Sequence, residues 1–512
     1  MSSSARKLTQ QLGQAENYTQ WKAAAIACDE HMGLASWKQV DISRRYDYRS
    51  IRSRLDRLCE LRERRDDVGL LFTLNEGIHG NIGGMGRPTL YAKTKFGTKQ
   101  LVNDYVDEIV SALEHLASPA VTDISVVEKL EFFRRASHCF GRSALMLSGS
   151  GTLLYFHVGV IKALWQEDQL PTILSGASGG ALVSALVGTH THDELEAIFE
   201  PAYLLAEIQR EVGIWKSLFG FRPHQLQLGD LNAMLDRLIP DLTFQEAFER
   251  TGRHINISVA PAELMQTSRL LNAMTSPNVC IREALLASAA LPGFFPPVML
   301  SAKNVRGERQ PYLPSRKWVD GSISEDLPAK RLARLYGVNH YIASQTNPLV
   351  LPFVTDKKVK EGSLATVRHA AQRTLKEWVE AGAMLMHKPL SSKPQLHKLM
   401  HNIASVVRQE YTADINIIPP KRLFNPFKLL ALRSEQDVME MIRAGEQATW
   451  PKVEMIRTST KISKTLDRIL ADFEQPNTAE RDRPGRSLPF CPGSIPSTPP
   501  GEWCLAASEW LE

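Results

Sequence analysis

A glycine-flanked serine between an apolar run and a helix-like stretch constrains this chain more than any other feature. The pentapeptide G-x-S-x-G runs from Gly176 to Gly180, after Ile173-Leu174 and before 181–187. A turn from strand to helix within about two residues strains the backbone at the serine, and glycines remove the Cβ atoms that would clash there. The hydroxyl of Ser178 would then sit at a helix N-terminus, which favours developing negative charge. Ser178 is therefore a candidate nucleophile, although a glycine-rich turn without function gives the same string.

A second strand, glycine loop and helix precede this pentapeptide. Apolar residues 144–147 lead into the loop 148–152, and helical spacing follows from Tyr155 to Gln166. The backbone N–H groups of such a loop can bind an anion, either a phosphate or an oxyanion. No Gly-Lys-Ser/Thr follows, and the third glycine of a dinucleotide fingerprint is missing. An oxyanion hole is the better interpretation.

A third segment, Trp318-Val319-Asp320-Gly321-Ser322, places a carboxylate at a strand end, although alone it reads as an ordinary Asp-Gly turn.

The histidines decide between a triad and a dyad. A Ser-His-Asp triad needs a histidine on a loop after the acid. His340 lies in an apolar strand-like run, and the four later histidines lie in helical stretches. This favours Asp320 acting directly on Ser178, with His157 as a packed residue behind the loop.

Together, these segments resemble the patatin-like phospholipase family. There a glycine-rich oxyanion loop, a G-x-S-x-G elbow and an Asp-Gly motif occur in this order, and serine and aspartate work as a dyad. The resemblance extends from Ser143 to about Pro348 and includes 287–297. It implies that Ser178 is the nucleophile and Asp320 its base. It further implies elbow glycines at Gly176 and Gly180, and oxyanion donors at Gly149, Ser150, Gly151 and Thr152.

The loop departs from the family pattern. Ser150 and Leu154 stand where the family usually has glycine, and Ser322 replaces the last small residue of the aspartate motif. Ser150 can present its N–H only if its backbone angles are not those reserved for glycine. A second function therefore stays open, that of a catalytically weak patatin-like protein that binds lipid or serves as a scaffold.

The flanks resemble those of the lipid-droplet triacylglycerol lipases and their bacterial relatives. Some members of that subgroup are also acyltransferases with an H-x-x-x-x-D motif, a spacing that this sequence lacks. The matching segments are 18–22, 45–48, 77–84 and 97–99 before the core, and 414–417 and 445–451 after it.

The pattern of elements predicts an α/β fold, a patatin-like parallel sheet sandwiched by helices, with helical additions at both ends. Strands are expected around Ala144, Ile173, Ile255, Trp318 and Tyr341. The expected parts are a helical N-terminal domain (1–138), the catalytic core (139–348), a helical C-terminal region (349–474) and a disordered tail (475–512).

Residues 367–385 have helical spacing of apolar residues within a segment that the core does not need. This helix either packs on the fold or is a lid that enters a lipid surface. In the second case Trp378 and 384–386 would enter lipid, and nearby lysines would meet anionic head groups.

Composition fits a large enzyme that works inside the cell. The 512 residues are 43% hydrophobic, the net charge is +5, and the six cysteines have no metal spacing. No apolar run approaches the roughly 20 residues that span a bilayer, and no secretory signal precedes the first helix. We therefore expect a cytoplasmic protein without metal, cofactor or nucleic acid, peripheral at a membrane or droplet, which acts on a glycerolipid or phospholipid ester. The oligomeric state stays open.

Overall fold

The computed structural model describes residues 3–200, 203, 206, 228–263, 267–290, 295–322, 325–347, 350–351, 413–420 and 434–474. Met1–Leu470 form one compact unit and Ala471–Glu512 a second, of which 471–474 are described as the end of a helix. The predicted interfacial helix at 367–385 and the predicted tail at 475–512 lie outside the described residues.

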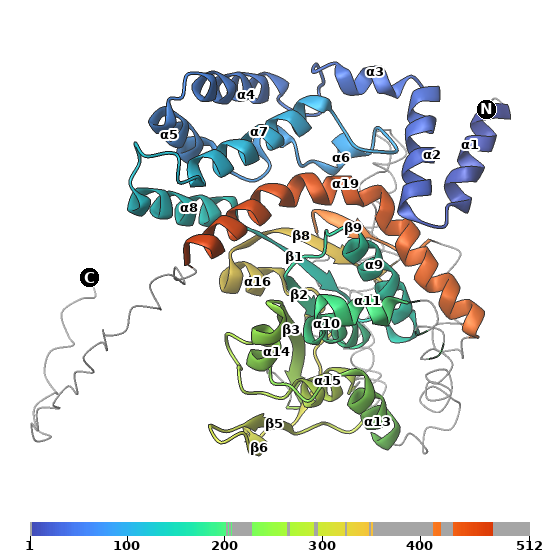
Figure 1. Cartoon of the computed structure of the whole chain (residues 1–512). Helices are drawn as coiled ribbons and strands as arrows, with labels where there is room; N and C mark the ends of the chain where they lie inside the picture. The colour runs from blue at the N-terminus through green and yellow to red at the C-terminus, as the bar shows by residue number, and fades with distance from the viewer. Residues whose placement is uncertain are drawn as a thin grey trace, which may run out of the picture. The chain divides into compact units, whose positions relative to one another are not determined.

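Helices make up the part of the chain before the sheet (Figure 1). Side chains of Asn17, Asp47, Asp66 and Ser125 accept backbone N–H groups of the first turns, which sets where four of these helices begin. Helical structure is interrupted near Asp41, and 77–97 contain only short helical turns. The elements are α1 (Ser3–Gln14), α2 (Tyr18–His31), α3 (Leu34–Gln39), α4 (Tyr48–Glu63), α5 (Asp67–Gly77), η1 (Ile82–Gly84), α6 (Pro88–Tyr91), α7 (Gln100–Ala117) and α8 (Val126–Phe140).

A mixed sheet lies at the centre of the core, in the order β4-β3-β2-β1-β8-β9, with β7 also paired to β3. Strands β3, β2, β1, β8 and β9 run parallel, whereas β4 and β7 run antiparallel to β3. All five predicted strands exist, but the sheet is not wholly parallel, because the hairpin β5–β6 precedes β7 in place of a crossover helix. The strands are β1 (Arg142–Leu147), β2 (Ile173–Gly176), β3 (His254–Pro261), β4 (Arg269–Leu271), β5 (Leu300–Lys303), β6 (Arg309–Tyr312), β7 (Trp318–Asp320), β8 (Val338–Ser344) and β9 (Ile415–Ile417).

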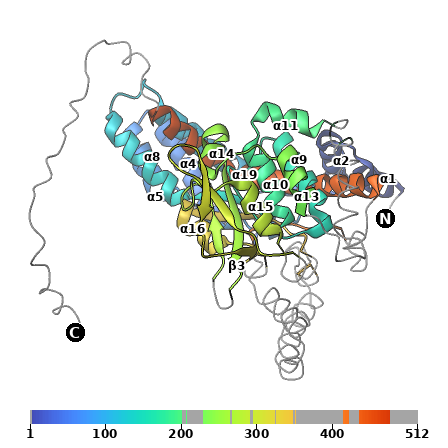
Figure 2. The same cartoon turned by 90° about the horizontal axis from the view of Figure 1, so that it is seen from below.

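Helices cover both faces of this sheet, as predicted (Figures 1 and 2). Ala181 and Ala185 of α10 pack with Ile255 of β3, whereas Leu332 of α16 packs with Ala144 of β1 on the opposite face. Alternate residues of a strand point to opposite faces, so the two clusters lie on either side of the sheet. The helices are α9 (Leu154–Gln166), α10 (Gly179–Thr189), α11 (His192–Phe199), α13 (Leu228–Leu238), α14 (Phe244–Thr251), α15 (Ile281–Ala289) and α16 (Ala329–Tyr336).

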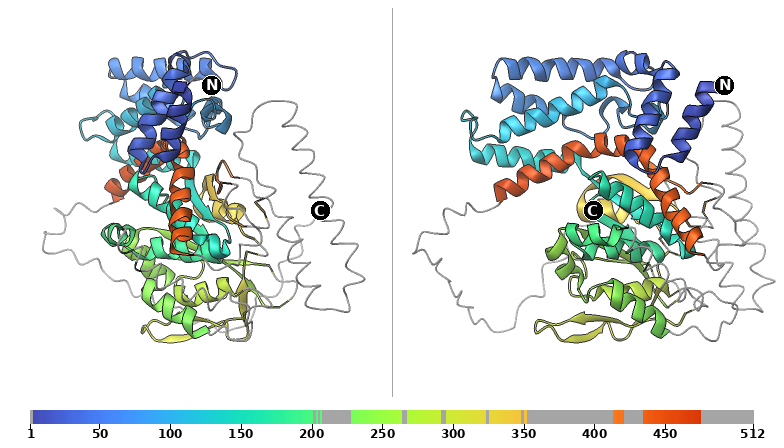
Figure 3. Two further views of the ribbon diagram at one scale, coloured as in Figure 1. Left: turned by 90° about the vertical axis from the view of Figure 1, so that its right-hand side faces the viewer. Right: turned by 45° about the vertical axis from the view of Figure 1, so that its right-hand side comes forward.

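The long helix α19 (Glu435–Glu474) lies between the N-terminal helices and the core (Figure 3). Its Trp450 and Val453 pack with Trp21 of α2 and with Ala163 of α9. Gly159 and Gly445 let α9 and α19 touch backbone to backbone, since a Cβ on either glycine would collide with a carbonyl oxygen of the other helix. Helix α9 starts directly after the glycine loop, so α19 helps to fix the position of that loop.

Strand β9 extends the sheet beyond residue 348, where the sequence placed the end of the core. It pairs in parallel with β8, with Ser344 opposite Ile417. Asp414 secures the start of this strand, because its Oδ2 accepts the backbone N–H of Tyr341 at 2.8 Å. Among the described helices, none is long and apolar enough to cross a membrane.

Candidate active site

Ser178 occupies a sharp turn between β2 and α10. Its backbone angles are φ 51° and ψ −123°, in a region that residues other than glycine rarely adopt. A Cβ on Gly176 would collide with the carbonyl oxygen of Gly180, and one on Gly180 with that of Leu147. Both glycines are therefore required by close backbone packing. The strand, turn and helix predicted around the pentapeptide are present, and the serine stands at the helix N-cap.

A buried serine holds this turn from behind. The backbone N–H of Ser178 donates to Ser288 Oγ at 2.9 Å, and the Ser288 hydroxyl donates to the carbonyl oxygen of Ser258 at 2.9 Å. This chain of hydrogen bonds ties the turn to α15 and β3. Ser288 lies in the segment 287–297 that resembles the family, but its role could not be predicted from the sequence, because its partners lie 110 and 30 residues away.

Asp320 ends β7, opposite Val259 of β3, and its side chain meets that of Ser178. The residue is 2% exposed, and its Oδ1 accepts the backbone N–H of Ser322 at 2.8 Å. Burial raises the pKa of this carboxyl to about 7, while hydrogen bonds from Ser322 and from the Ser178 side chain oppose the rise. A carboxylate with a pKa near neutrality is suited to accept a proton. The side chains of the two predicted residues are thus in direct contact.

The glycine loop follows β1 and approaches the same turn. Gly149 donates its N–H to Asp326 Oδ1 at 2.7 Å, so this group already has a partner inside the fold. Ser150 has φ −131° and ψ −22°, and the positive φ of the loop, 51°, falls on Gly151. The serine therefore does not occupy a conformation reserved for glycine. The presence of Ser150 where the family usually has glycine therefore causes no backbone strain.

Comparisons with known proteins identify the family of this chain. A model described as Patatin-like phospholipase matches residues 145–333, and a domain of unknown function, DUF3336, matches 1–138. A patatin-like phospholipase domain-containing protein of Meyerozyma guilliermondii is 32% identical over 491 residues, which cover 90% of this chain and 67% of the relative. This chain belongs to the patatin-like phospholipase family. The resemblance predicted from the sequence is confirmed.

Other relatives of this patatin-like chain have lipase names. Triacylglycerol lipase ptl2 of Schizosaccharomyces pombe is 31% identical across 91% of the chain and 75% of its own length. Triacylglycerol lipase 4 of Saccharomyces cerevisiae is 32% identical across 91% of the chain, which spans only 53% of that protein. The match to the crystal structure of VipD from Legionella pneumophila covers 59% of this chain and 67% of the VipD chain, at 12% identity and a TM-score of 0.26.

A second buried carboxylate supports the glycine loop of this patatin-like chain. Besides Gly149, Asp326 binds Asn347, whose Nδ2 donates to Oδ2 at 2.9 Å. Burial raises the pKa of the Asp326 carboxyl to about 7, hydrogen bonds from Asn347 and Gly149 oppose the rise, and the charge of Asp320 adds to it. The role of Asp326 was not predicted from the sequence. The available signal was a second aspartate six residues after Asp320.

His157 lies behind the loop, as predicted, and is wholly buried. Its Nδ1 lies 2.7 Å from Ser344 Oγ and its Nε2 lies 3.0 Å from the carbonyl oxygen of Ser148. Burial lowers its pKa to about 4, so the ring is neutral at physiological pH. His340 pairs with Ser143 at the start of β1, at the opposite end of that strand from the loop. Neither histidine is placed to act on Ser178.

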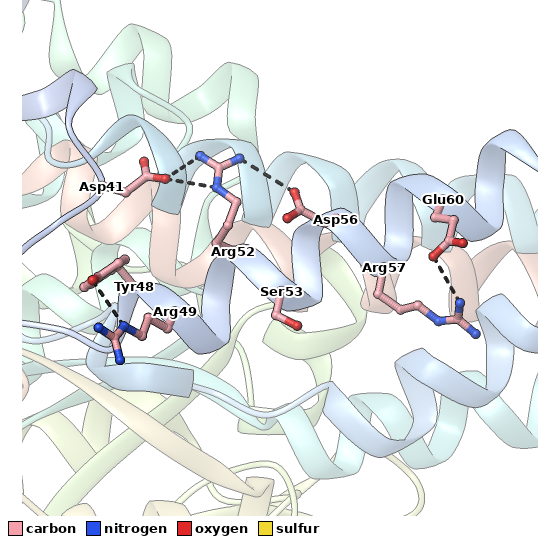
Figure 4. A pocket seen from close by; sticks show the side chains of 8 residues that line it. All are labelled: Asp41, Tyr48, Arg49, Arg52, Ser53, Asp56, Arg57 and Glu60. Atoms are coloured by element: carbon pink, nitrogen blue, oxygen red, sulfur yellow. Dashed lines mark hydrogen bonds and ion pairs between the residues drawn. The ribbon is translucent and has the colours of Figure 1, made fainter.

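Two hollows elsewhere were not predicted. An open one of about 540 Å³ lies on α4 (Figure 4). Within it Arg52 pairs with Asp41 at 2.7 Å, and Arg57 pairs with Glu60 at 3.2 Å. Its lining is Asp41, Tyr48, Arg49, Arg52, Ser53, Asp56, Arg57 and Glu60. A smaller one of about 140 Å³ lies near Asn339 and His340.

Within the described part of the chain, no group of three or more His, Cys, Asp or Glu could hold a metal ion.

Proposed function

We propose that this chain is a lipid acyl hydrolase, a serine esterase that cleaves glycerolipid or phospholipid esters through a Ser178–Asp320 dyad. The observation that carries the proposal is the contact of the Ser178 side chain with a buried carboxyl whose pKa is raised to about 7. The names of the relatives, patatin-like phospholipase and triacylglycerol lipase, support the substrate class.

In the proposed reaction, Ser178 Oγ attacks the ester carbonyl and Asp320 accepts the hydroxyl proton. Negative charge on the carbonyl oxygen is stabilised by N–H groups of the loop 150–152 and by the N-terminus of α10. The alcohol leaves with the proton from Asp320, and an acyl-enzyme remains. Water then attacks that ester, again giving a proton to Asp320, and the fatty acid departs with Ser178 restored.

The proposed site needs no metal or cofactor, because positioned side chains and backbone donors supply every step. We infer a cytoplasmic protein that meets its substrate at a membrane or droplet surface, since long-chain esters reside there. A catalytically weak binding protein would not need a raised pKa beside a strained serine. The relaxed backbone of Ser150 also removes the reason for expecting a damaged loop.

A lipid panel tests the proposal. The full chain would be incubated with detergent-dispersed triacylglycerol, diacylglycerol, phospholipid or lysophospholipid, and released fatty acid would be measured, with Ser178→Ala as the matched control. We expect hydrolysis of at least one class by the wild type and none by the variant. Equal release by both proteins, or no release together with no labelling by a fluorophosphonate, would overturn the proposed function.

A further inference from the structure

The side chain of Ser150 is an unusual feature of the proposed oxyanion loop. The residue is 3% exposed, and its Oγ has no hydrogen-bond partner within the part of the chain that the structure describes. A buried hydroxyl without a partner is destabilising, and a catalytic role is one of the explanations for such a group in a native structure. The backbone of Ser150 does not require a serine, because its angles suit most residues.

The location of this hydroxyl indicates what it serves. A Cβ on Gly179 would collide with Ser150 Oγ, so the oxygen lies against the first residue of α10, next to Ser178. The oxyanion of an ester under attack by Ser178 would form between the loop and this helix N-terminus. A hydroxyl at that place needs no partner in the free enzyme, because it finds one when negative charge develops.

We propose that the Ser150 hydroxyl is a catalytic residue, which donates a hydrogen bond to the oxyanion alongside the backbone N–H groups of the loop. This inference rests on the proposed function of the site. The hydroxyl keeps its proton throughout and forms no covalent bond. It supplies a side-chain donor where the N–H of Gly149 is already bound to Asp326.

A second buried hydroxyl provides the control. Ser184 on α10 is wholly buried, and its Oγ likewise has no partner among the described residues. It lies in the middle of the helix, five residues beyond its first residue, Gly179. Ser150→Ala and Ser184→Ala therefore remove the same group from similar surroundings, and only the first change lies at the loop.

Kinetics with a soluble short-chain ester test the inference. Ser150→Ala should lower kcat by about 10- to 100-fold with little change in KM, since removing a single oxyanion donor costs up to 10²–10³. Its Tm should not fall. Inhibition by an alkyl trifluoromethyl ketone, which forms an oxyanion on Ser178, should weaken by a similar factor. Ser184→Ala should match the wild type in both assays.

The outcomes separate the two proposals. If the wild type shows no turnover that depends on Ser178, the proposed function fails and this inference fails with it. If the wild type is active and Ser150→Ala keeps its full kcat, or if Ser184→Ala is equally impaired, the inference alone is wrong.

Discussion

Asp326 Oδ1 accepts the backbone N–H of Gly149 at 2.7 Å, which joins the segment after the proposed base to the proposed oxyanion loop. Since a misplacement of about 1 Å can cost a factor of 10² in rate, Asp326→Ala should lower kcat strongly. Asp326→Asn should be impaired less than the alanine variant, because its amide oxygen can still accept the Gly149 N–H, although its amide nitrogen would face the Asn347 Nδ2 donor. Steady-state kinetics of both variants check this. An alanine variant with normal kcat would show that the loop does not depend on this bond.

The sequence predicted those parts of the site that depend on local pattern. The turn at Ser178 follows from two glycines between an apolar run and a helix, and the place of Asp320 follows from a strand that ends in Asp-Gly. Asp326 and Ser288 were missed because their partners lie 177 and 110 residues away. The antiparallel direction of β7 was not predicted either. The pattern of apolar and polar residues along a strand shows which face is buried, but not the direction of the neighbouring strand.

Activity should depend on pH near neutrality. The pKa of the Asp320 carboxyl is raised to about 7, and a base must be deprotonated to accept a proton. We therefore expect kcat/KM for a soluble ester to rise with pH through about 7 and to fall about tenfold per unit below it. A profile that is flat between about pH 5 and 8 would contradict a role for Asp320 as the base.

The raised pKa of Asp320 also predicts how stability depends on pH. A carboxyl whose pKa is higher in the folded state contributes stability below its unfolded value, and that stability is lost as pH rises through about 7. Asp320→Asn should therefore raise Tm at pH 8 and have a much smaller effect at pH 4. The gain is at most about 4 kcal/mol, from roughly 3 pKa units at 1.36 kcal/mol each. A variant that melts lower at pH 8 than the wild type would contradict this.

Close backbone contact at the turn predicts a severe defect for Gly180→Ala. The new Cβ would meet the carbonyl oxygens of Leu147 and Ser148, which cannot move without disturbing β1. Overpacking of this kind typically costs 1–3 kcal/mol. Denaturant unfolding should show the loss, with Gly13→Ala as control, because a Cβ on Gly13 in α1 meets nothing within 4 Å. Equal stability of both variants would mean that the turn can relax.

Site mapping of a fluorophosphonate adduct by mass spectrometry tests the central claim, that Ser178 is a nucleophile activated by Asp320. The wild type should carry the adduct on the peptide that contains Ser178, and Ser178→Ala should carry none. Asp320→Asn should react at the same residue, but about 10²-fold more slowly because the base is gone. An adduct on another residue, or labelling of Ser178→Ala at the wild-type rate, would contradict the account.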